Sequence, residues 1–152
     1  MELSRVYENQ NSEDLQGFFS KAPWEWALSC SGDHGMQTDT LERVFATWRS
    51  QTAKKTGLQL AVMGVITRKG HPHLHGVMVG RNKAGKNLLD TSLSMVLELQ
   101  EDWRKMAHNS GKIEIIRDLG WARYMVTKNL LYSPTARVLQ PFNTNLIKKL
   151  TK

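Results

Sequence analysis

Residues 58–80, LQLAVMGVITRKGHPHLHGVMVG, hold two apolar runs that flank a short polar segment. The runs, at 58–67 and 73–79, contain β-branched residues and have the length of strands. The segment 68–72 contains a glycine and a proline, which favour a turn. The stretch therefore predicts a β-hairpin.

The chain on both sides of this hairpin alternates between strand and helix patterns. The expected elements are a strand at 24–31, a helix at 39–57, the hairpin, a helix at 91–109, a strand at 112–116 and a helix at 119–131. In the first strand, Trp24, Trp26, Leu28 and Cys30 are expected to share one face. The order β-α-β-β-α-β plus one helix is typical of an α+β, ferredoxin-like antiparallel sheet. Such a sheet carries two helices on one face and leaves the other face for ligands or a further helix.

Length and composition predict one domain. A chain of 152 residues with 40% hydrophobic residues can bury one core, and no repeat or bilayer-spanning apolar run is visible, so we expect no membrane partner. We expect a loosely ordered segment at 1–20, the domain at 21–132 and a basic extension at 133–152. The single cysteine, Cys30, fits a core position and a reducing, cytoplasmic environment. Core positions are also expected for the tryptophans of the two long helices, Trp48 and Trp103.

Basic residues are concentrated in the middle of the chain. Residues 43–89 hold nine Lys and Arg and no acid, residues 1–42 hold two bases and eight acids, and the whole chain has a formal net charge of +7. A polyanion is the natural partner of such a segment, since each phosphate contact releases a condensed counterion. The alternative is that these charges are solvated loop and helix-end residues.

His73 and His75 stand at alternate positions of the second apolar run. Because side chains alternate along a strand, both imidazoles project from the same side. Two imidazoles in this arrangement can bind one divalent ion. The alternative is that each histidine only forms hydrogen bonds.

Tyr124 and Lys128 are four residues apart in the expected helix 119–131, which places them one above the other on one helical face. A tyrosine can attack a phosphodiester when a metal ion polarises the phosphate and a cation stabilises the developing charge. The alternative is a packing role for Tyr124 and a solvated helix-end charge for Lys128.

Taken together, these motifs resemble those of the HUH endonucleases. The segment Pro72–Gly76, followed by Val77–Val79, is similar to their histidine, hydrophobic residue, histidine signature, and Tyr124 with Lys128 looks like their tyrosine helix. The segment 24–31 occupies the place of the first strand motif of rolling-circle replication initiators. The resemblance spans roughly residues 22–132 and includes the order of elements. It implies the HUH endonuclease fold, an RRM-like antiparallel sheet with a tyrosine-bearing helix.

The resemblance implies a metal-dependent enzyme that nicks and joins single-stranded DNA, at an origin or hairpin, to initiate rolling-circle replication. The tyrosine of such enzymes stays linked to the 5′ phosphate and leaves a 3′ hydroxyl. On this basis we expect Mn²⁺ or Mg²⁺ to be bound by His73, His75 and Glu25, with Tyr124 as the nucleophile and Lys128 as the cation at the phosphate. The alternatives to Glu25 as the third ligand are His71, Glu114 and Gln59.

Contacts to DNA are expected from the basic block and from the tyrosine helix. Trp121 precedes Tyr124 by about one helical turn and is a candidate for stacking on an unpaired base, with a core position as the alternative. The full set of expected DNA contacts is Arg68, Lys69, Arg81, Lys83, Arg123 and Trp121.

Two other functions remain open. A single-tyrosine transposase of the same superfamily would have a similar size and would share its sites in a dimer. A non-catalytic ferredoxin-like protein would bind nucleic acid through a basic sheet face. The sequence has no Gly-rich phosphate-binding loop, so unwinding would require a separate helicase of the host or of the element. The expected location is the cytoplasm of a cell that hosts a plasmid, a virus or a mobile element.

Overall fold

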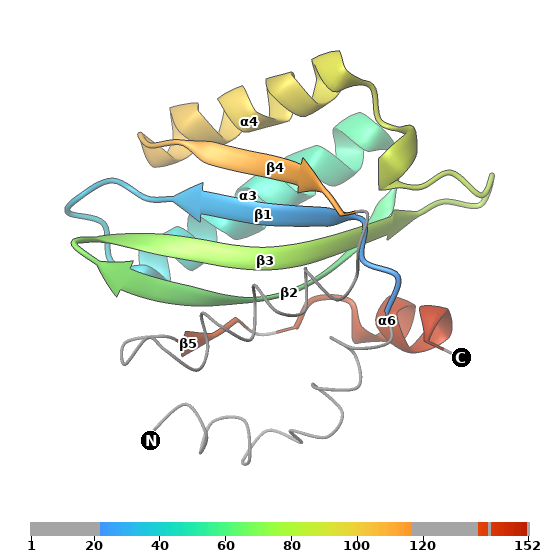
Figure 1. The fold of residues 1–152 in the computed structure, drawn as a ribbon, viewed down its shortest axis with the longest axis horizontal. Helices are drawn as coiled ribbons and strands as arrows, with labels where there is room; N and C mark the ends of the chain where they lie inside the picture. The colour runs from blue at the N-terminus through green and yellow to red at the C-terminus, as the bar shows by residue number, and fades with distance from the viewer. Residues whose placement is uncertain (1–21, 117–136, 140, 152) are drawn as a thin grey trace.

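A computed structural model of the chain describes residues 22–116, 137–139 and 141–151 (Figure 1). Its elements are β1 (Trp26–Ser31), α3 (Thr38–Thr56), β2 (Gln59–Lys69), β3 (His71–Arg81), the 3-10 helix η1 (Leu88–Asp90), α4 (Leu93–Ala107), β4 (Gly111–Ile115), β5 (Arg137–Val138) and α6 (Thr144–Leu150). The strands form one antiparallel sheet in the order β4-β1-β3-β2-β5. The chain is therefore an α+β protein, as expected, and its strand order is compatible with a ferredoxin-like fold.

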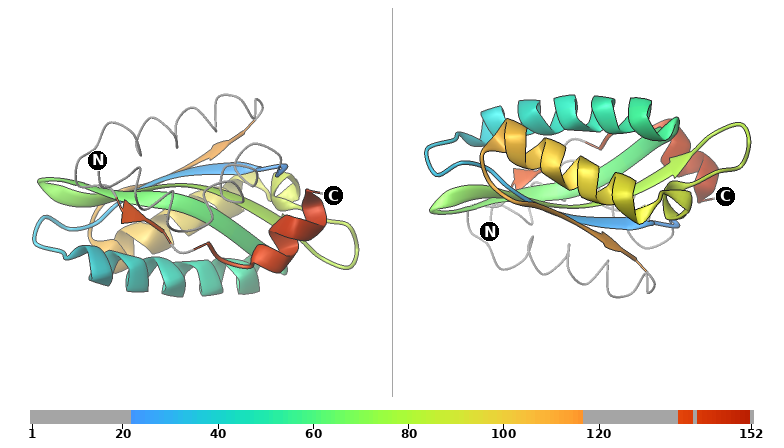
Figure 2. Two further views of the ribbon diagram at one scale, coloured as in Figure 1. Left: turned by 90° about the horizontal axis from the view of Figure 1, so that it is seen from below. Right: turned by 90° about the horizontal axis from the view of Figure 1, so that it is seen from above.

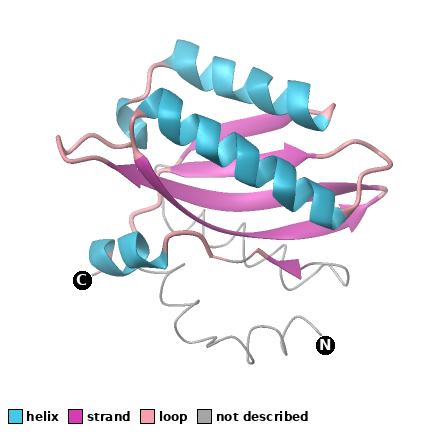
Figure 3. Cartoon of the chain, turned by 180° about the vertical axis from the view of Figure 1, so that it is seen from behind, coloured by secondary structure: helices cyan, strands magenta, loops and turns pink. Residues whose placement is uncertain are grey.

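The helices α3 and α4 lie side by side on one face of the sheet (Figures 2 and 3). Trp48 of α3 and Trp103 of α4 meet edge to face, with their ring centroids 6.2 Å apart, and both are buried, as expected. Their indole N–H groups donate to the carbonyl oxygens of Leu99 and Ser31, so neither is buried without a partner. This pair joins the two helices to each other and to β1.

Cys30 is also in this core, as the sequence predicts. Burial raises the pKa of its thiol to about 12, with a small opposing effect of a backbone hydrogen bond from Lys112. The thiol therefore stays protonated at neutral pH and is unreactive.

The hairpin of β2 and β3 is longer and tighter than the sequence predicts. The two strands pair from Gln59 opposite Arg81 to Lys69 opposite His71, so only Gly70 stands between them. Gly70 has a φ of 80°, a backbone conformation that glycine adopts without a steric penalty. The turn lies within the expected 68–72 but is shorter, because pairing continues through residues that favour turns elsewhere.

The first strand also differs from the expectation. β1 begins at Trp26, which packs in the core beneath α3 and α4. Trp24 precedes the strand and belongs to a second apolar cluster, which includes Met63 and Val77 of the opposite sheet face. Trp24 therefore does not share the face of Trp26, because the regular alternation does not extend back to it.

The basic extension expected at 133–152 contains two described elements that the sequence did not indicate. β5 pairs with β2 at one edge of the sheet, and α6 contributes Leu146 and Ile147 to the second apolar cluster. The guanidinium of Arg137 forms ion pairs with Asp39 and Glu42 at the start of α3. The expected helix at 119–131 and the N-terminal segment lie outside the described residues. Within the described ranges, no helix has the length and apolar character needed to cross a membrane.

The close approach of β2 and β3 generates a stability prediction. A Cβ atom on Gly64 would lie 2.5 Å from the carbonyl oxygen of His75 and 2.9 Å from the Cα of Gly76. We expect Gly64→Ala to lower the free energy of unfolding by about 1–3 kcal/mol, because backbone atoms have to shift. Chemical denaturation measures this change. The matched control is Gly35→Ala, whose Cβ meets no atom within 4 Å; equal losses in both variants would contradict the prediction.

Candidate functional site

Three histidines line one face of β3. His71, His73 and His75 alternate with residues such as Leu74, which enters the core beneath α3 and α4. The histidines therefore lie on the opposite face of the sheet. The ring centroids of His71 and His73 are 4.2 Å apart and those of His73 and His75 are 6.3 Å apart. The structure thus brings the two expected metal ligands together, and it adds His71 to the same row.

The placement of His71 corrects a sequence-based argument. The expected turn at 68–72 included His71 and Pro72, but both lie within β3, where Pro72 is opposite Arg68. His71 therefore keeps the strand alternation and shares the face of His73. The exposed loop after β1 adds His34, whose ring centroid is 6.4 Å from that of His71.

Two serines of β1 stand opposite the two expected ligands. Ser29 pairs with His75, and Ser31 pairs with His73. The Ser31 hydroxyl oxygen lies 3.0 Å from Nδ1 of His73, which is a hydrogen bond between side chains. Nδ1 of His75 is buried and has no hydrogen-bond partner in the part of the chain that the structure describes. A buried ring nitrogen without a partner is uncommon in folded proteins and indicates an unmet interaction.

The surroundings of both imidazoles favour the neutral form. Burial lowers the pKa of His75, and the neighbouring charge of His73 lowers it further. Burial likewise lowers the pKa of His73, with a second contribution from His71. A metal ion binds the lone pair of a neutral imidazole, so these shifts keep both ligands available at neutral pH.

The donor set fits a divalent ion that takes two imidazole nitrogens from the protein and completes its coordination shell with oxygen ligands. The unpartnered Nδ1 of His75 and the neutral state of both rings support this fit. Imidazole ligands suit transition metals, whereas Mg²⁺ prefers oxygen ligands. Among residues 22–116 and the described parts of 137–151, no group of three or more His, Cys, Asp and Glu is arranged to hold a metal ion.

The structure does not bring Glu25 to the histidines. Glu25 precedes Ser29 by four residues, which is roughly 13 Å along an extended chain. Its buried carboxylate accepts hydrogen bonds from the backbone N–H groups of Gly80 and Leu88 and forms an ion pair with Arg81 at 2.9 Å. We therefore correct its expected role: Glu25 holds the end of β3 to the following loop and is not a third ligand. The sequence shows an acid near a strand start but not which groups surround it.

The other candidate ligands are also separated from the pair. Gln59 lies opposite Arg81, at the end of the hairpin away from the histidines. Glu114 is on β4, opposite Ala27, and forms an ion pair with Lys112 at 3.2 Å. Of the candidates that the sequence suggested, only His71 lies beside the pair.

The expected DNA-binding residues of the hairpin lie at its two ends. Arg68 is near the tip, where its guanidinium donates to the carbonyl oxygen of Met36. Lys69 pairs with His71 across the strands. Arg81 and the exposed Lys83 are at the far end, and Arg81 is bound to Glu25. These cations therefore do not form a single patch, although they are close in the sequence.

Lys112 is a cation that the sequence analysis did not single out. It lies on β4 opposite Ser29, which is itself opposite His75, so the three residues form one row across the sheet. Its side chain is exposed on the histidine face, about 10 Å from the His75 backbone at two strand spacings. Only the strand order reveals this proximity, because 36 residues separate the two positions.

The remaining expected site residues lie outside the described residues: Tyr124, Lys128, Trp121 and Arg123.

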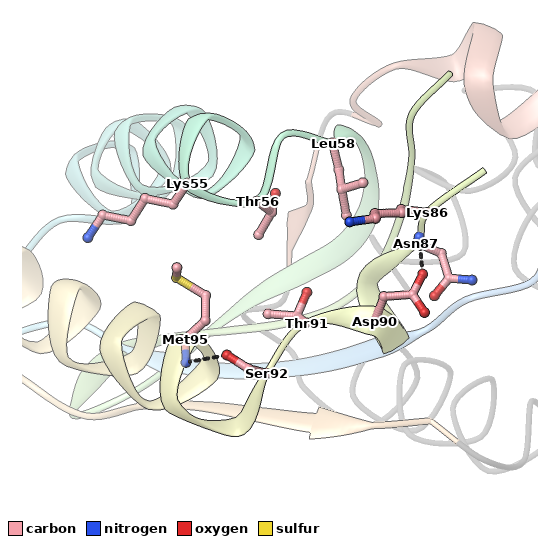
Figure 4. A pocket seen from close by; sticks show the side chains of 9 residues that line it. All are labelled: Lys55, Thr56, Leu58, Lys86, Asn87, Asp90, Thr91, Ser92 and Met95. Carbon is pink, nitrogen blue, oxygen red and sulfur yellow. Dashed lines mark hydrogen bonds between the residues drawn. The ribbon is translucent and has the colours of Figure 1, made fainter. Parts of the chain in front are cut away.

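A cavity of about 290 Å³ lies at the opposite end of the molecule, between the end of α3, η1 and the start of α4 (Figure 4). Lys55 and Lys86 line it, but Lys55 is bound to Glu98 and Asp102 of α4. The side chain of Asn87 and that of Asp90 close a capping box around η1. Lys55, Asn87 and Asp90 therefore serve the local structure, and the cavity is separate from the histidine row.

The lowered pKa values of His73 and His75 predict how stability depends on pH. The unfolded chain binds more protons than the folded protein between the folded pKa values and about 6.5, so the free energy of unfolding falls as the pH decreases through this range. We expect His75→Gln to reduce this loss. Chemical denaturation in the presence of a chelator, between about pH 7.5 and about pH 5, measures the change in the free energy of unfolding. Parallel curves for the wild type and the variant would contradict the prediction.

Comparisons with known proteins identify no relative: no family model, no curated protein and no solved structure matches the chain.

Proposed function

We propose that this protein is a metal-dependent endonuclease of the HUH type that nicks and joins single-stranded DNA. The observation that carries the proposal is the pair His73 and His75, neutral and side by side on the sheet face opposite α3 and α4. The strand order β4-β1-β3-β2 and the place of this pair on a central strand support it.

His73 and His75 would hold Mn²⁺ or Mg²⁺. The ion, when bound, polarises the scissile phosphate and makes its phosphorus a better electrophile. The chain's own contribution is to present both imidazoles unprotonated on a rigid strand that is paired on both sides.

Tyr124 would supply the nucleophile. Its phenol oxygen loses its proton to solvent and forms a bond to phosphorus, while the bond from phosphorus to the 3′ oxygen breaks and the departing 3′ oxygen takes up a proton from solvent. Lys128 would stabilise the charge on the phosphate oxygens. The phosphotyrosine ester conserves the energy of the broken phosphodiester bond. A 3′ hydroxyl can therefore reverse the step and join strands. In rolling-circle replication the released 3′ hydroxyl would serve as the primer.

The assignment of Tyr124 rests on the tyrosine-helix resemblance in the sequence. Ile116 follows the edge strand β4, and Arg137 begins β5 at the other edge. Residues 117–136 stand between them in the sequence and lie outside the described residues. Tyr124 is among these residues in the sequence. Tyr7 and Tyr132 are the other tyrosines of the chain.

Two further functions are compatible with this site. A single-tyrosine transposase would use the same chemistry at a mobile-element end. A non-catalytic nucleic-acid-binding protein is favoured by one observation: the described residues provide no acidic third ligand beside the histidines. Formation of a covalent adduct separates the enzymes from the binding protein.

Tyr124→Phe is the most direct test. With Mn²⁺ and a pool of single-stranded oligonucleotides, we expect the wild type to form a covalent adduct through a 5′ phosphate. The variant should keep DNA binding and lose both the adduct and nicking, because the phenol oxygen is absent. Denaturing electrophoresis and mass spectrometry detect the adduct. His73→Ala should lose it as well, and chelator should abolish it in the wild type.

Tyr132→Phe is the matched control and should form the adduct at the wild-type level. An adduct mapped to Tyr7 or Tyr132 would contradict the assignment of the nucleophile. The absence of an adduct with every substrate and metal, together with intact DNA binding, would favour the non-catalytic function.

Lys112→Ala tests whether DNA crosses the histidine face. Loss of one phosphate contact should flatten the dependence of log affinity for single-stranded DNA on log salt by about 0.7. The fold should persist, since an exposed ion pair such as Lys112–Glu114 contributes only about 0–1 kcal/mol. Fluorescence anisotropy at several salt concentrations measures the slope. Lys54→Ala, on α3, is the control; equal slopes for the two variants would place the DNA elsewhere.

A further inference from the structure

The hydrogen bond between Ser31 and His73 links two residues that are directly opposite in the register of β1 and β3. The Ser31 hydroxyl oxygen is 3.0 Å from Nδ1 of His73, a normal hydrogen-bond distance. Both residues are on the histidine face of the sheet. Strand pairing places the two residues opposite each other, and the orientation of their side chains completes the contact.

The backbone of Ser31 is held on both of its polar groups. Its N–H donates to the carbonyl oxygen of Ser110 at 2.9 Å, and its carbonyl oxygen accepts from the indole N–H of Trp103, also at 2.9 Å. Trp103 is a residue of α4 and is fully buried in the core between the helices and the sheet. The hydroxyl of Ser31 is consequently presented to His73 from a fixed position.

A neutral imidazole carries its proton on one nitrogen and a lone pair on the other. If Nδ1 of His73 carries the proton, it donates to the Ser31 hydroxyl oxygen, and Nε2 keeps the lone pair that a metal ion needs. If Nε2 carries the proton instead, Nδ1 accepts from Ser31 and Nε2 cannot bind a metal ion. Because a hydroxyl can donate or accept, the hydrogen bond fits both tautomers, and only the Nδ1–H form leaves Nε2 free for a metal ion.

We propose that Ser31 is a positioning residue that holds His73 as the Nδ1–H tautomer and so presents Nε2 to a divalent ion. This inference rests on the proposed metal-binding function. Ser31 acts through His73 and touches neither the ion nor the DNA. Its role is to remove the cost of selecting a tautomer and a ring orientation when the ion binds.

Ser29 provides a matched control within the same strand. It occupies the equivalent register position opposite His75. Nδ1 of His75 has no hydrogen-bond partner among the described residues, so Ser29 does not bind it. The two serines thus have the same size, strand and face, and they differ in their contact with a histidine.

The first experiment reads the tautomer in the full chain without metal. Long-range ¹H–¹⁵N spectra of the ¹⁵N-histidine-labelled protein, recorded where the imidazoles are neutral, distinguish the two tautomers, and His73→Gln assigns the signal. We expect Nδ1–H for His73 in the wild type, in Ser29→Ala and in Ser31→Thr. Ser31→Ala should shift His73 toward the Nε2–H form. An Nε2–H tautomer in the wild type would overturn the inference without the need for any variant.

The second experiment measures Mn²⁺ binding by calorimetry. We expect Ser31→Ala to weaken binding about 10- to 100-fold, as is usual when the partner of a ligating histidine is removed. Ser31→Thr, which keeps the hydroxyl, and Ser29→Ala should bind like the wild type. Unchanged affinity in a folded Ser31→Ala protein would overturn the inference. Failure of the wild type to bind Mn²⁺ would instead overturn the proposed metal function, and the tautomer measurement would still decide the role of Ser31.

Discussion

The pairing of β3 with β1 on one side and β2 on the other is the constraint on which the rest of the structure depends. This register sends Leu74 and Met78 into the core beneath α3 and α4 and sends His73 and His75 to the other face. A slip of one residue would exchange the two sets, because side chains alternate with a period of two. It would bury imidazoles in the apolar core and expose the core residues. The apolar packing therefore fixes the face on which the histidines stand.

The core and the histidine row are connected through β1. The indole of Trp103 donates to the backbone of Ser31, and the hydroxyl of Ser31 contacts His73. Two hydrogen bonds of Ser31 therefore connect α4 to the candidate ligand His73. At the other end of the hairpin, Glu25 forms an equally specific network, which ties Gly80 and Arg81 to the start of β1. At one end of the sheet the polar groups stabilise the fold, and at the other end they form the candidate metal site.

Much of the fold could be predicted because its patterns are local. The two long helices follow apolar spacing, and β2 and β3 are apolar runs of strand length, so both were identified with small errors at their ends. The errors occur where tertiary contacts override local preference. Gly70 alone makes the turn, Trp24 packs on the second face of the sheet, and α6 gains its apolar partners from β2. None of these outcomes follows from the residues next to them in the chain.

The sequence by itself determined that His73 and His75 share one side of a strand, since alternation is a property of the extended backbone. It also determined the basic, acid-free segment that contains them. Only the tertiary structure decided what surrounds the pair. Pairing of distant strands brought Ser31 and Lys112 to the histidine face and directed the carboxylate of Glu25 to Arg81 instead. The physical reason is that hydrogen bonds and charges act over a few ångströms in space, and the neighbours at that range are chosen by strand order and not by sequence separation.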